Sequence, residues 1–402
     1  MAARNNRTAN IEVKGAKTMR KVAIAGVGMT KVSSHWDKSL RTLFAETAIK
    51  TLEDAGNPGV DAAFIGNMSA EEFTKQKNIG TLLSDFSGLT NIPATRVEAA
   101  DASGGSALLE GFTAVASGLY DAVLVGGVEK MSEAISSETT EILSMAADQE
   151  YETFHGLPLV GAAAMLMRLY LHKFKATREQ FAGFTVQMHE NATSNPYAQL
   201  RFKTTLEKAL NARPIADPIT LMDCAPAGDG AAALILCSLE KAKKITDAPV
   251  QIVGVGQATD TLALHDREDL LTFKAVSKAA QKAYKMAKIT SKDVDVLEIH
   301  DSYTITALIS IEDLGFSEKG SAGLLVEDGG ITKDSQVPVN PSGGLKARGH
   351  PVGATGVYQA AEITLQLRGE ADGMQVKDAE IGLTENISGM ASLANIHIMK
   401  RI

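Results

Sequence analysis

Four polar residues lie at predicted turns between strands and the elements that follow them, namely Asp101, His300, His350 and Asn386. Carboxylate and imidazole groups are the side chains that most often transfer protons near neutral pH. Burial raises the pKa of a carboxyl toward the range that suits a general base, whereas a helix dipole or a nearby protonated histidine lowers it, so the sequence leaves the direction of the net shift open. We therefore expect acid–base chemistry at a site formed by these turns.

Asp101 and the histidines also have purely structural interpretations. Aspartate is a preferred residue at the start of a helix, where it contributes about 1 kcal/mol, and Asp101 precedes a segment expected to be helical from about 103 to 117. His300 follows an apolar segment, where a single histidine is more often a hydrogen-bonded core residue. The recurrence of such turns in two parts of the chain favours the functional interpretation for His300 and His350.

The elements that position these turns alternate between short apolar segments and segments with helical spacing. Segments 21–26, 60–66, 95–99 and 121–126 are predicted strands, and 39–53 and about 103–117 are predicted helices. Strands that alternate with helices pair in parallel and need helices on both faces of the sheet. Ligands of such folds bind beyond the carboxyl ends of the strands, where the four turns lie.

The C-terminal part of the chain contains sequence segments that match those of the N-terminal part in the same order. KVAIAGVGMT is matched by VQIVGVGQAT, VDAAFIGNMS by VDVLEIHDSY, RVEAADASGGSALLEG by VPVNPSGGLKARGHPVGATG, and DAVLVGGVEKM by AEIGLTENISGMA. Four matches in the same order indicate a tandem duplication of one α/β unit, whose turns meet at a shared cleft. We predict a disordered leader (1–19), an N-terminal half (20–130 and 213–247), an inserted helical lobe (131–212) and a C-terminal half (248–402).

The composition argues against several classes of protein. The 402 residues have a formal net charge of -8 and no basic block, which argues against nucleic acid binding. No apolar run is long enough to span a membrane. The two cysteines, Cys224 and Cys237, exclude a disulfide scaffold and indicate a reducing compartment, so we expect a cytoplasmic location.

Two further patterns do not indicate a site. Gly26 and Gly28 follow the first predicted strand but lack the third glycine of a dinucleotide-binding fingerprint. Asp223 and Asp229 have no cluster of histidines or cysteines beside them, so no metal site is predicted.

Several segments together resemble the thiolase superfamily, in particular the branch similar to archaeal acetoacetyl-CoA thiolases and sterol-carrier-protein-type thiolases. They span roughly residues 20–398 and read VEAADASGGSALLEGFTAVASG, VGGVEKM, LMDCAPAGDGAAALIL, EIHDSYT, IEDLGF and NPSGGLKARGHPVGATG. The resemblance implies a five-layered αβαβα thiolase fold with two duplicated halves and an inserted loop lobe. It also implies an acyl-CoA substrate that brings coenzyme A to the site, no covalently bound cofactor, a homodimer, and a small zinc-ribbon and OB-fold partner subunit.

The sequence departs from this family where sulfur is expected. The residue that opens the helix after VEAA is a cysteine nucleophile in the family and is Asp101 here. The family's His-Asp-Cys-Phe, whose cysteine is an acid/base, reads HDSY at 300–303, with Ser302 and Tyr303 in the last two positions. The C-terminal turn, where other thiolases carry an acid/base cysteine, begins with Asn386 and contains no thiol.

The resemblance implies roles for the remaining residues. His350, and a water held by His300, would stabilise the oxyanion of a thioester enolate. A second oxyanion hole would use the backbone amides of Asp101 and Ser388, although the charge of Asp101 opposes an anion there. Tyr303 would fill the volume of phenylalanine or donate a proton, and His155 in the lobe is a candidate for the acyl pocket.

Three functions are compatible with these residues. Attack of the Asp101 carboxylate on a thioester would expel a thiolate whose pKa is about four units higher, which is uphill. We therefore expect Asp101 to remove a proton from a β-hydroxyl, so that the neighbouring bond breaks as a retro-aldol, similar to the steroid side-chain aldolases of the superfamily. The alternatives are an acetyl-CoA C-acyltransferase in which Asp101 replaces the cysteine as an introduced substitution, and a noncatalytic subunit of a heteromeric complex.

Overall fold

The computed structural model describes residues 19–402, so the leader predicted over 1–19 lies almost wholly outside the described residues. Nine strands form one mixed sheet in the order β3-β2-β4-β7-β1-β8-β11-β10-β9. The N-terminal strands are β1 (Val22–Met29), β2 (Ala62–Gly66), β3 (Ala94–Val97), β4 (Ala122–Glu129) and β7 (Gly230–Ser238). The C-terminal strands are β8 (Val250–Thr259), β9 (Val296–Glu298), β10 (Ile381–Ser388) and β11 (Leu393–Arg401).

The two parts of the sheet share one topology. In the first part β2 pairs in parallel with β3 and β4, whereas β7 pairs antiparallel with β4 and β1. In the second part β9 pairs in parallel with β10, and β11 pairs antiparallel with β10 and β8. A parallel bridge between Leu297 and Val339 occupies the place that β3 has beside β2. The same chain order of strands therefore occurs twice, and a short antiparallel pairing of β1 with β8 joins the two parts.

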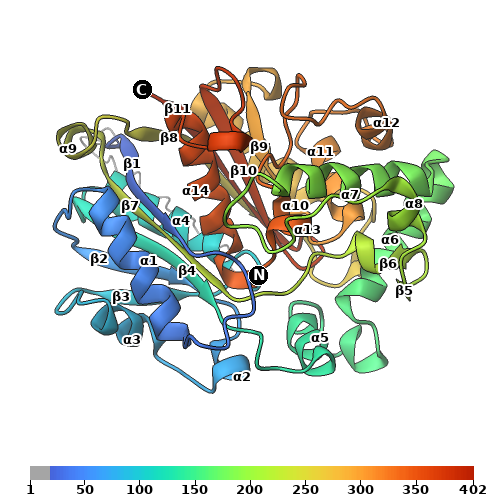
Figure 1. The fold of residues 1–402 in the computed structure, drawn as a ribbon, viewed down its shortest axis with the longest axis horizontal. Helices are drawn as coiled ribbons and strands as arrows, with labels where there is room; N and C mark the ends of the chain where they lie inside the picture. The colour runs from blue at the N-terminus through green and yellow to red at the C-terminus, as the bar shows by residue number, and fades with distance from the viewer. Residues whose placement is uncertain (1–18) are drawn as a thin grey trace, which may run out of the picture.

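Helices cover both faces of each part and lie between them (Figure 1). The outer helix of the first part is α1 (Leu40–Asp54), and those of the second part are α10 (Lys274–Ala287) and α11 (Thr304–Asp313). The central layer consists of α4 (Ser103–Ala116) and α14 (Thr355–Arg368), which pack on each other. The layers therefore alternate as helix, sheet, helix, sheet, helix.

The alternation of side chains along β7 shows why this strand needs a helix layer on each side. Ala231, Ala233 and Ile235 join the apolar cluster under α1. The intervening Leu234 and Leu236 join the cluster around α4 and α14. Successive side chains of a strand point to opposite faces, so an uninterrupted apolar strand is stable only between two layers.

Glycines allow the beginnings of the two central helices to lie very close together. A Cβ atom on Gly104 of α4 would lie 2.9 Å from the carbonyl oxygen of Gly353, just before α14. A Cβ atom on Gly356 of α14 would lie 2.3 Å from the backbone nitrogen of Gly105. Any larger residue would separate the helices, and with them the turns that carry Asp101 and His350.

The chain between β4 and β7 contributes four α-helices and a two-stranded sheet. They are α5 (Ser136–Ser144), α6 (Leu159–Phe174), α7 (Arg178–Ala192), α8 (Leu206–Leu210), β5 (Pro214–Ala216) and β6 (Ile219–Thr220). The remaining α-helices are α2 (Ala70–Thr74), α3 (Ile79–Phe86), α9 (Leu239–Ile245), α12 (Ala322–Glu327) and α13 (Gly344–Arg348). Within residues 19–402, no helix combines the length and the apolar character that a bilayer crossing needs.

Candidate active site

Three of the predicted site residues converge although they lie far apart in the sequence. One side-chain ligand atom from each of Asp101, His300 and His350 lies within 4.8 Å of the other two. The rings of His300 and His350 meet edge to face, with their centroids 5.0 Å apart. Asp101 is 3% exposed, His300 is fully buried and His350 is 7% exposed. The turns predicted to share one site therefore do so.

The backbone before Asp101 is held in an unfavourable conformation. Ala100 has a φ of 49°, in the left-handed region that residues with a Cβ atom seldom adopt. Such strain costs on the order of 1–3 kcal/mol and persists only where surrounding contacts fix it. Here the hydroxyl of Ser103 donates to the Ala100 carbonyl at 2.6 Å, and the Ala100 amide donates to Glu98 at 2.6 Å.

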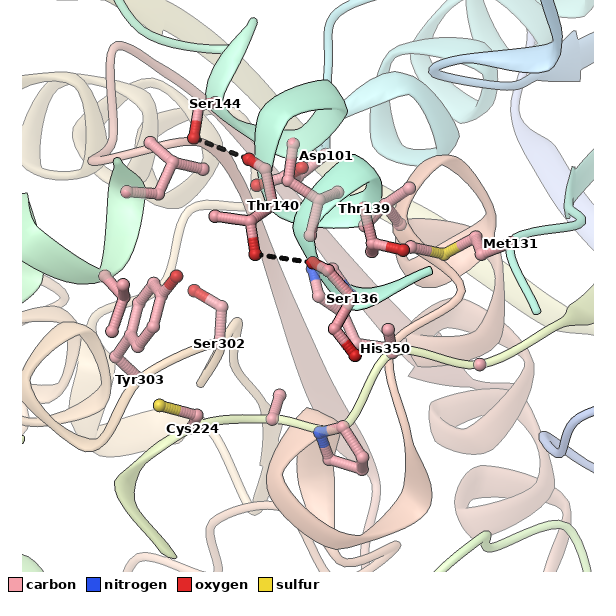
Figure 2. A pocket seen from close by; sticks show the side chains of 18 of the residues that line it. Asp101, Met131, Ser136, Thr139, Thr140, Ser144, Cys224, Ser302, Tyr303 and His350 are labelled. Carbon is pink, nitrogen blue, oxygen red and sulfur yellow. Dashed lines mark hydrogen bonds between the residues drawn. The ribbon is translucent and has the colours of Figure 1, made fainter. Parts of the chain in front are cut away.

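A cavity of about 550 Å³ opens beside Asp101 and His350. Ser302, Tyr303 and Cys224 also line it, and Figure 2 shows these three side chains close to one another. Its other wall comes from α5 and the start of α6, through Ser136, Thr139, Thr140, Leu143, Ser144, Leu159 and Val160. The segment between β4 and β7 thus covers the converging turns and leaves a space between itself and the sheet.

The Asp101 carboxyl is only partly satisfied by hydrogen bonds. Its Oδ2 accepts one from the amide of Gly389 at 3.3 Å, whereas its buried Oδ1 has no partner among the described residues. Burial raises the pKa of Asp101 to about 7, the Gly389 amide opposes the rise, and the charge of Glu98 adds to it. This carboxyl therefore exchanges its proton near neutral pH.

Both histidines are neutral near pH 7. Burial is the main cause that lowers the pKa of His300 well below its usual value, and the electrostatic influence of His350 and Arg348 adds to it. Burial and then Arg348 lower the pKa of His350 to about 3. The Nδ1 atom of His350 lies 2.8 Å from the hydroxyl of Thr355, so its Nε2 is the free ring nitrogen.

Asn386 joins the turns of the two parts of the sheet. Its Oδ1 accepts a hydrogen bond from the amide of Gly105 at 2.9 Å. Its Nδ2 donates to the carbonyl of Asp101 at 3.1 Å and lies 3.0 Å from Nδ1 of His300. The side chain of Asn386 therefore contacts the start of α4 and one of the two histidines.

The other side chains at the cavity are poor acids. Burial raises the pKa of Tyr303 above its usual value, and the charges of Cys224 and Asp101 add to the rise. Burial likewise raises the pKa of Cys224 to about 12, so its thiolate is scarce near pH 7. The buried Oγ of Ser302 has no hydrogen-bond partner among the described residues.

One predicted site residue lies outside the cavity, and the neighbour of another contacts Asp101. His155 is exposed, packs edge to face against Phe154, and is not among the residues that line the cavity. At the C-terminal turn, the amide that reaches the Asp101 carboxyl belongs to Gly389, one residue after Ser388. Gly389 has a φ of 49° and lines the cavity, so the turn presents this amide to the site.

Sequence reasoning missed two buried acids that hold the histidine turns. Glu385 accepts hydrogen bonds from the His300 amide at 2.8 Å and from the Ser310 hydroxyl at 2.6 Å. Glu129 accepts one from the amide of Gly353, three residues after His350, at 3.1 Å. Glu129 ends the otherwise apolar strand β4, and that was the signal available in the sequence, whereas Glu385 lies between Thr384 and Asn386 in β10 and does not stand out.

Known protein families match almost the whole of the described chain. The profile described as "Thiolase, N-terminal domain" matches residues 22–240, and "Thiolase C-terminal domain-like" matches residues 256–401. The chain belongs to the thiolase family. The predicted fold class, a thiolase fold with two duplicated α/β halves, is confirmed.

The names of similar proteins refer to more than one kind of reaction. An acetyl-CoA acetyltransferase of Methanothermobacter thermautotrophicus is 49% identical over 95% of this chain and 100% of its own length. The benzoylsuccinyl-CoA thiolase subunit BbsB of Thauera aromatica is 32% identical over 90% of this chain and 92% of its own length. The structure of an Ltp2-ChsH2(DUF35) aldolase superimposes with a TM-score of 0.83 at 23% identity, over 94% of this chain and 98% of its own. The structure of human mitochondrial 3-ketoacyl-CoA thiolase in complex with CoA superimposes with a TM-score of 0.75 at 18% identity, over 96% of this chain and 99% of its own. At such identities the two structures show the fold alone.

Proposed function

We propose that this chain is a thiolase-family enzyme that makes or breaks a carbon–carbon bond of a CoA thioester by aldol or retro-aldol chemistry, with Asp101 as general base. One observation carries the proposal. The Asp101 carboxyl lines the cavity with one oxygen free of partners among the described residues, and two neutral histidines lie beside it. A carboxyl with a pKa of about 7 is well matched to accept and return a proton at neutral pH.

These three side chains lie close enough together for one substrate oxygen to contact all of them. Because no two of the three ligand atoms lie more than 4.8 Å apart, a point between them lies within about 2.8 Å of all three, which is within hydrogen-bond reach. A substrate oxygen at this point meets the Asp101 carboxylate and two imidazoles. Groups fixed in advance around a developing charge stabilise the transition state more than the substrate.

The proposed reaction begins with a β-hydroxyacyl-CoA. The Asp101 carboxylate takes the proton of the β-hydroxyl, whose oxygen becomes the carbonyl oxygen of an aldehyde or ketone as the Cα–Cβ bond breaks. The electron pair of that bond passes to the thioester as an enolate, whose oxygen the histidines stabilise. Asp101 then returns its proton to Cα, which gives the shortened acyl-CoA. Aldol addition is the same sequence in reverse.

The thiols of the chain do not support an acyl-enzyme. Cys224 lines the cavity, but its raised pKa keeps it protonated. Cys237 is buried in the apolar cluster under α1. Acylation of Asp101 itself would form a mixed anhydride, which lies uphill from a thioester because the carboxylate is the better leaving group. Proton transfer by Asp101 is therefore favoured over covalent catalysis.

A second candidate is an acetyl-CoA C-acyltransferase in which Asp101 replaces a catalytic cysteine. The name of the Methanothermobacter relative, at 49% identity, favours it. In that case Asp101→Cys gains thiolysis of β-ketoacyl-CoAs, because a thiol at the start of α4 is a suitable nucleophile. A noncatalytic subunit of a heteromeric complex has neither activity.

The assembly and location of the enzyme are part of the proposal. We infer a homodimer, a cytoplasmic location, and no cofactor beyond the coenzyme A of the substrate. The name of the aldolase structure, Ltp2-ChsH2(DUF35), supports a search for a small partner subunit of the zinc-ribbon and OB-fold type. Copurification from the native source tests that partner.

The decisive assay supplies two panels of substrates to the purified protein, alone and with any copurifying partner. We expect β-hydroxyacyl-CoAs to yield a carbonyl compound, trapped as a hydrazone, and a shortened acyl-CoA in equal amounts. Cys224→Ala serves as the control and keeps this activity, because the thiol takes no part. Thiolysis of β-ketoacyl-CoAs by the unaltered chain supports acyl transfer instead, and no turnover with either panel overturns both enzymatic assignments.

A further inference from the structure

The side chain of Asn386 can adopt only one orientation in its surroundings. At one end, Oδ1 accepts a hydrogen bond from the amide of Gly105. At the other end, Nδ2 donates to the carbonyl of Asp101. A flipped amide would place two donors together at Gly105 and two acceptors together at Asp101. Because an amide NH₂ only donates, Nδ2 also donates to the ring atom that it meets, Nδ1 of His300.

This orientation determines the tautomer of His300. A neutral imidazole has one nitrogen that donates and one that accepts. Nδ1 accepts from Asn386 at 3.0 Å, so the proton of the ring lies on Nε2. Nε2 is buried and has no hydrogen-bond partner among the described residues. The N–H at Nε2 is therefore a buried donor without a partner among the described residues, on the ring that meets His350 edge to face.

We propose that Asn386 is a positioning residue that locks His300 as an Nε2–H donor, so that the gap between Asp101, His300 and His350 binds an anionic oxygen and rejects divalent metal ions. Without Asn386, two histidines and a carboxylate at this spacing have the composition of a metal site. Ligation through Nε2 needs a lone pair on that atom and an acceptor for the proton on Nδ1. Asn386 offers a second donor there instead.

The tautomer is a property of the resting protein and does not depend on the reaction. Only the identity of the oxygen, as that of a thioester enolate or a β-hydroxyl, rests on the proposed function. A chain that proves inactive with every acyl-CoA still has a measurable tautomer. An experiment can therefore contradict the proposed tautomer of His300 without contradicting the proposed function, and the reverse.

The direct test is ¹⁵N NMR of the protein labelled at histidine, with His300 assigned by comparison with His300→Gln. We expect a protonated Nε2 and an unprotonated Nδ1 at neutral pH. A ring protonated at Nδ1 overturns the proposal. This measurement on the unaltered chain stands whether or not any further variant folds.

Asn386→Asp tests the same inference because it replaces the hydrogen-bond donor next to Nδ1 of His300 with an acceptor. A carboxylate accepts from Nδ1–H of His300 and leaves a lone pair on Nε2, which completes a metal site with Asp101 and His350. In titrations with Co²⁺ followed by visible absorption, we expect the variant to bind about 10- to 100-fold more tightly than the unaltered chain. Tight Co²⁺ binding by the unaltered chain that shifts the His300 signals overturns the proposal, as does an unchanged affinity in a folded variant.

Asn395 offers a matched control for this substitution. Its Nδ2 also bonds the start of α4, through the Ala102 carbonyl at 3.3 Å and the Ser106 hydroxyl at 3.0 Å, but among the described residues no bond joins it to either histidine. Asn395→Asp should therefore disturb the anchoring of α4 without changing the His300 tautomer or the affinity for Co²⁺. An equal gain of Co²⁺ affinity in Asn395→Asp shows a general loosening and contradicts the assignment to Asn386.

Discussion

Two buried aspartates precede helices in the two parts of this molecule, but their hydrogen bonding differs. Asp301 accepts hydrogen bonds from the amides of Leu345 at 2.7 Å and Lys346 at 3.3 Å, at the first turn of α13. Asp101, before α4, accepts a single bond from Gly389 at 3.3 Å, and its other oxygen has no partner within residues 19–402. Burial raises both pKa values, that of Asp301 to about 6 and that of Asp101 to about 7.

The difference separates a structural carboxylate from a reactive one. Backbone amides use both oxygens of Asp301, so this side chain holds α13 in place. The other oxygen of Asp101 has no partner among the described residues, and the side chain lines a cavity beside two neutral imidazoles, so the proposed mechanism assigns this oxygen to the substrate. A buried polar group without a partner is costly, and a functional site is where such a cost is retained.

The largest effect is expected on catalysis at Asp101. Asp101→Asn keeps the shape of the side chain but removes the base, so we expect kcat for carbonyl release from β-hydroxyacyl-CoA to fall by about 10²- to 10⁴-fold. Hydrazone trapping of the carbonyl product measures the rate. A loss of less than tenfold would remove Asp101 from the mechanism.

The same substitution should stabilise the fold at neutral and higher pH. The folded pKa of Asp101 is raised, so its contribution to stability is fully present below the unfolded pKa, near 4, and is lost as pH rises through about 7. At about pH 8 we expect Asp101→Asn to raise the free energy of unfolding by up to about 4 kcal/mol, with the gain shrinking toward pH 4. Urea denaturation at several pH values measures this; a loss of stability at pH 8 contradicts the expected direction.

Asp301 should respond in the opposite direction. Asp301→Ala leaves two buried backbone amides at the start of α13 without their acceptor, which should lower the free energy of unfolding by about 1–3 kcal/mol. Urea denaturation beside Asp101→Ala gives the matched comparison. If the two alanine variants lose equal stability, the proposed distinction between the carboxylates fails.

A smaller effect is expected in the pH profile of the unaltered enzyme. The base must be ionised, so log(kcat/KM) should rise with unit slope below about pH 7 and level off above it, roughly tenfold per unit. Both histidines have lowered pKa values and stay neutral in this range, so they add no further slope to the pH–rate profile. Rates that stay flat between about pH 5 and 8 would exclude Asp101 as the titrating group.

The smallest effect is expected at the predicted pocket residue that lies outside the cavity. His155→Ala should change kcat and KM by less than about twofold, since exposed side chains away from a site contribute little. Steady-state kinetics on the same substrate provide the check. A loss above tenfold would show that the loop at His155 reaches the substrate.

The sequence predicted the meeting of Asp101, His300 and His350 because the repeated pattern places each at a turn beyond a predicted strand, and equivalent turns meet at one cleft in a duplicated α/β fold. It did not predict which amide reaches Asp101, since the turn at Gly389 depends on a positive φ rather than on residue spacing. It also missed Glu129 and Glu385. Their partners lie on other elements, and only the packed structure defines those contacts.

The inserted segment was the least predictable part of the site. The sequence predicted an inserted helical lobe over 131–212, but which face of it covers the cavity depends on how α5 and α6 pack. Phe154 is 82% exposed, and the adjacent His155 is turned to solvent with it. A single histidine without a partner in the sequence carried no signal for that orientation.

Intact-mass spectrometry of the protein, quenched during turnover of a β-hydroxyacyl-CoA, tests the role of Asp101 most directly. We predict an unmodified chain while the aldehyde or ketone and the shortened acyl-CoA accumulate. A stable acyl adduct located at Asp101 would contradict the proposed mechanism, because the carboxylate would then be a nucleophile rather than a base.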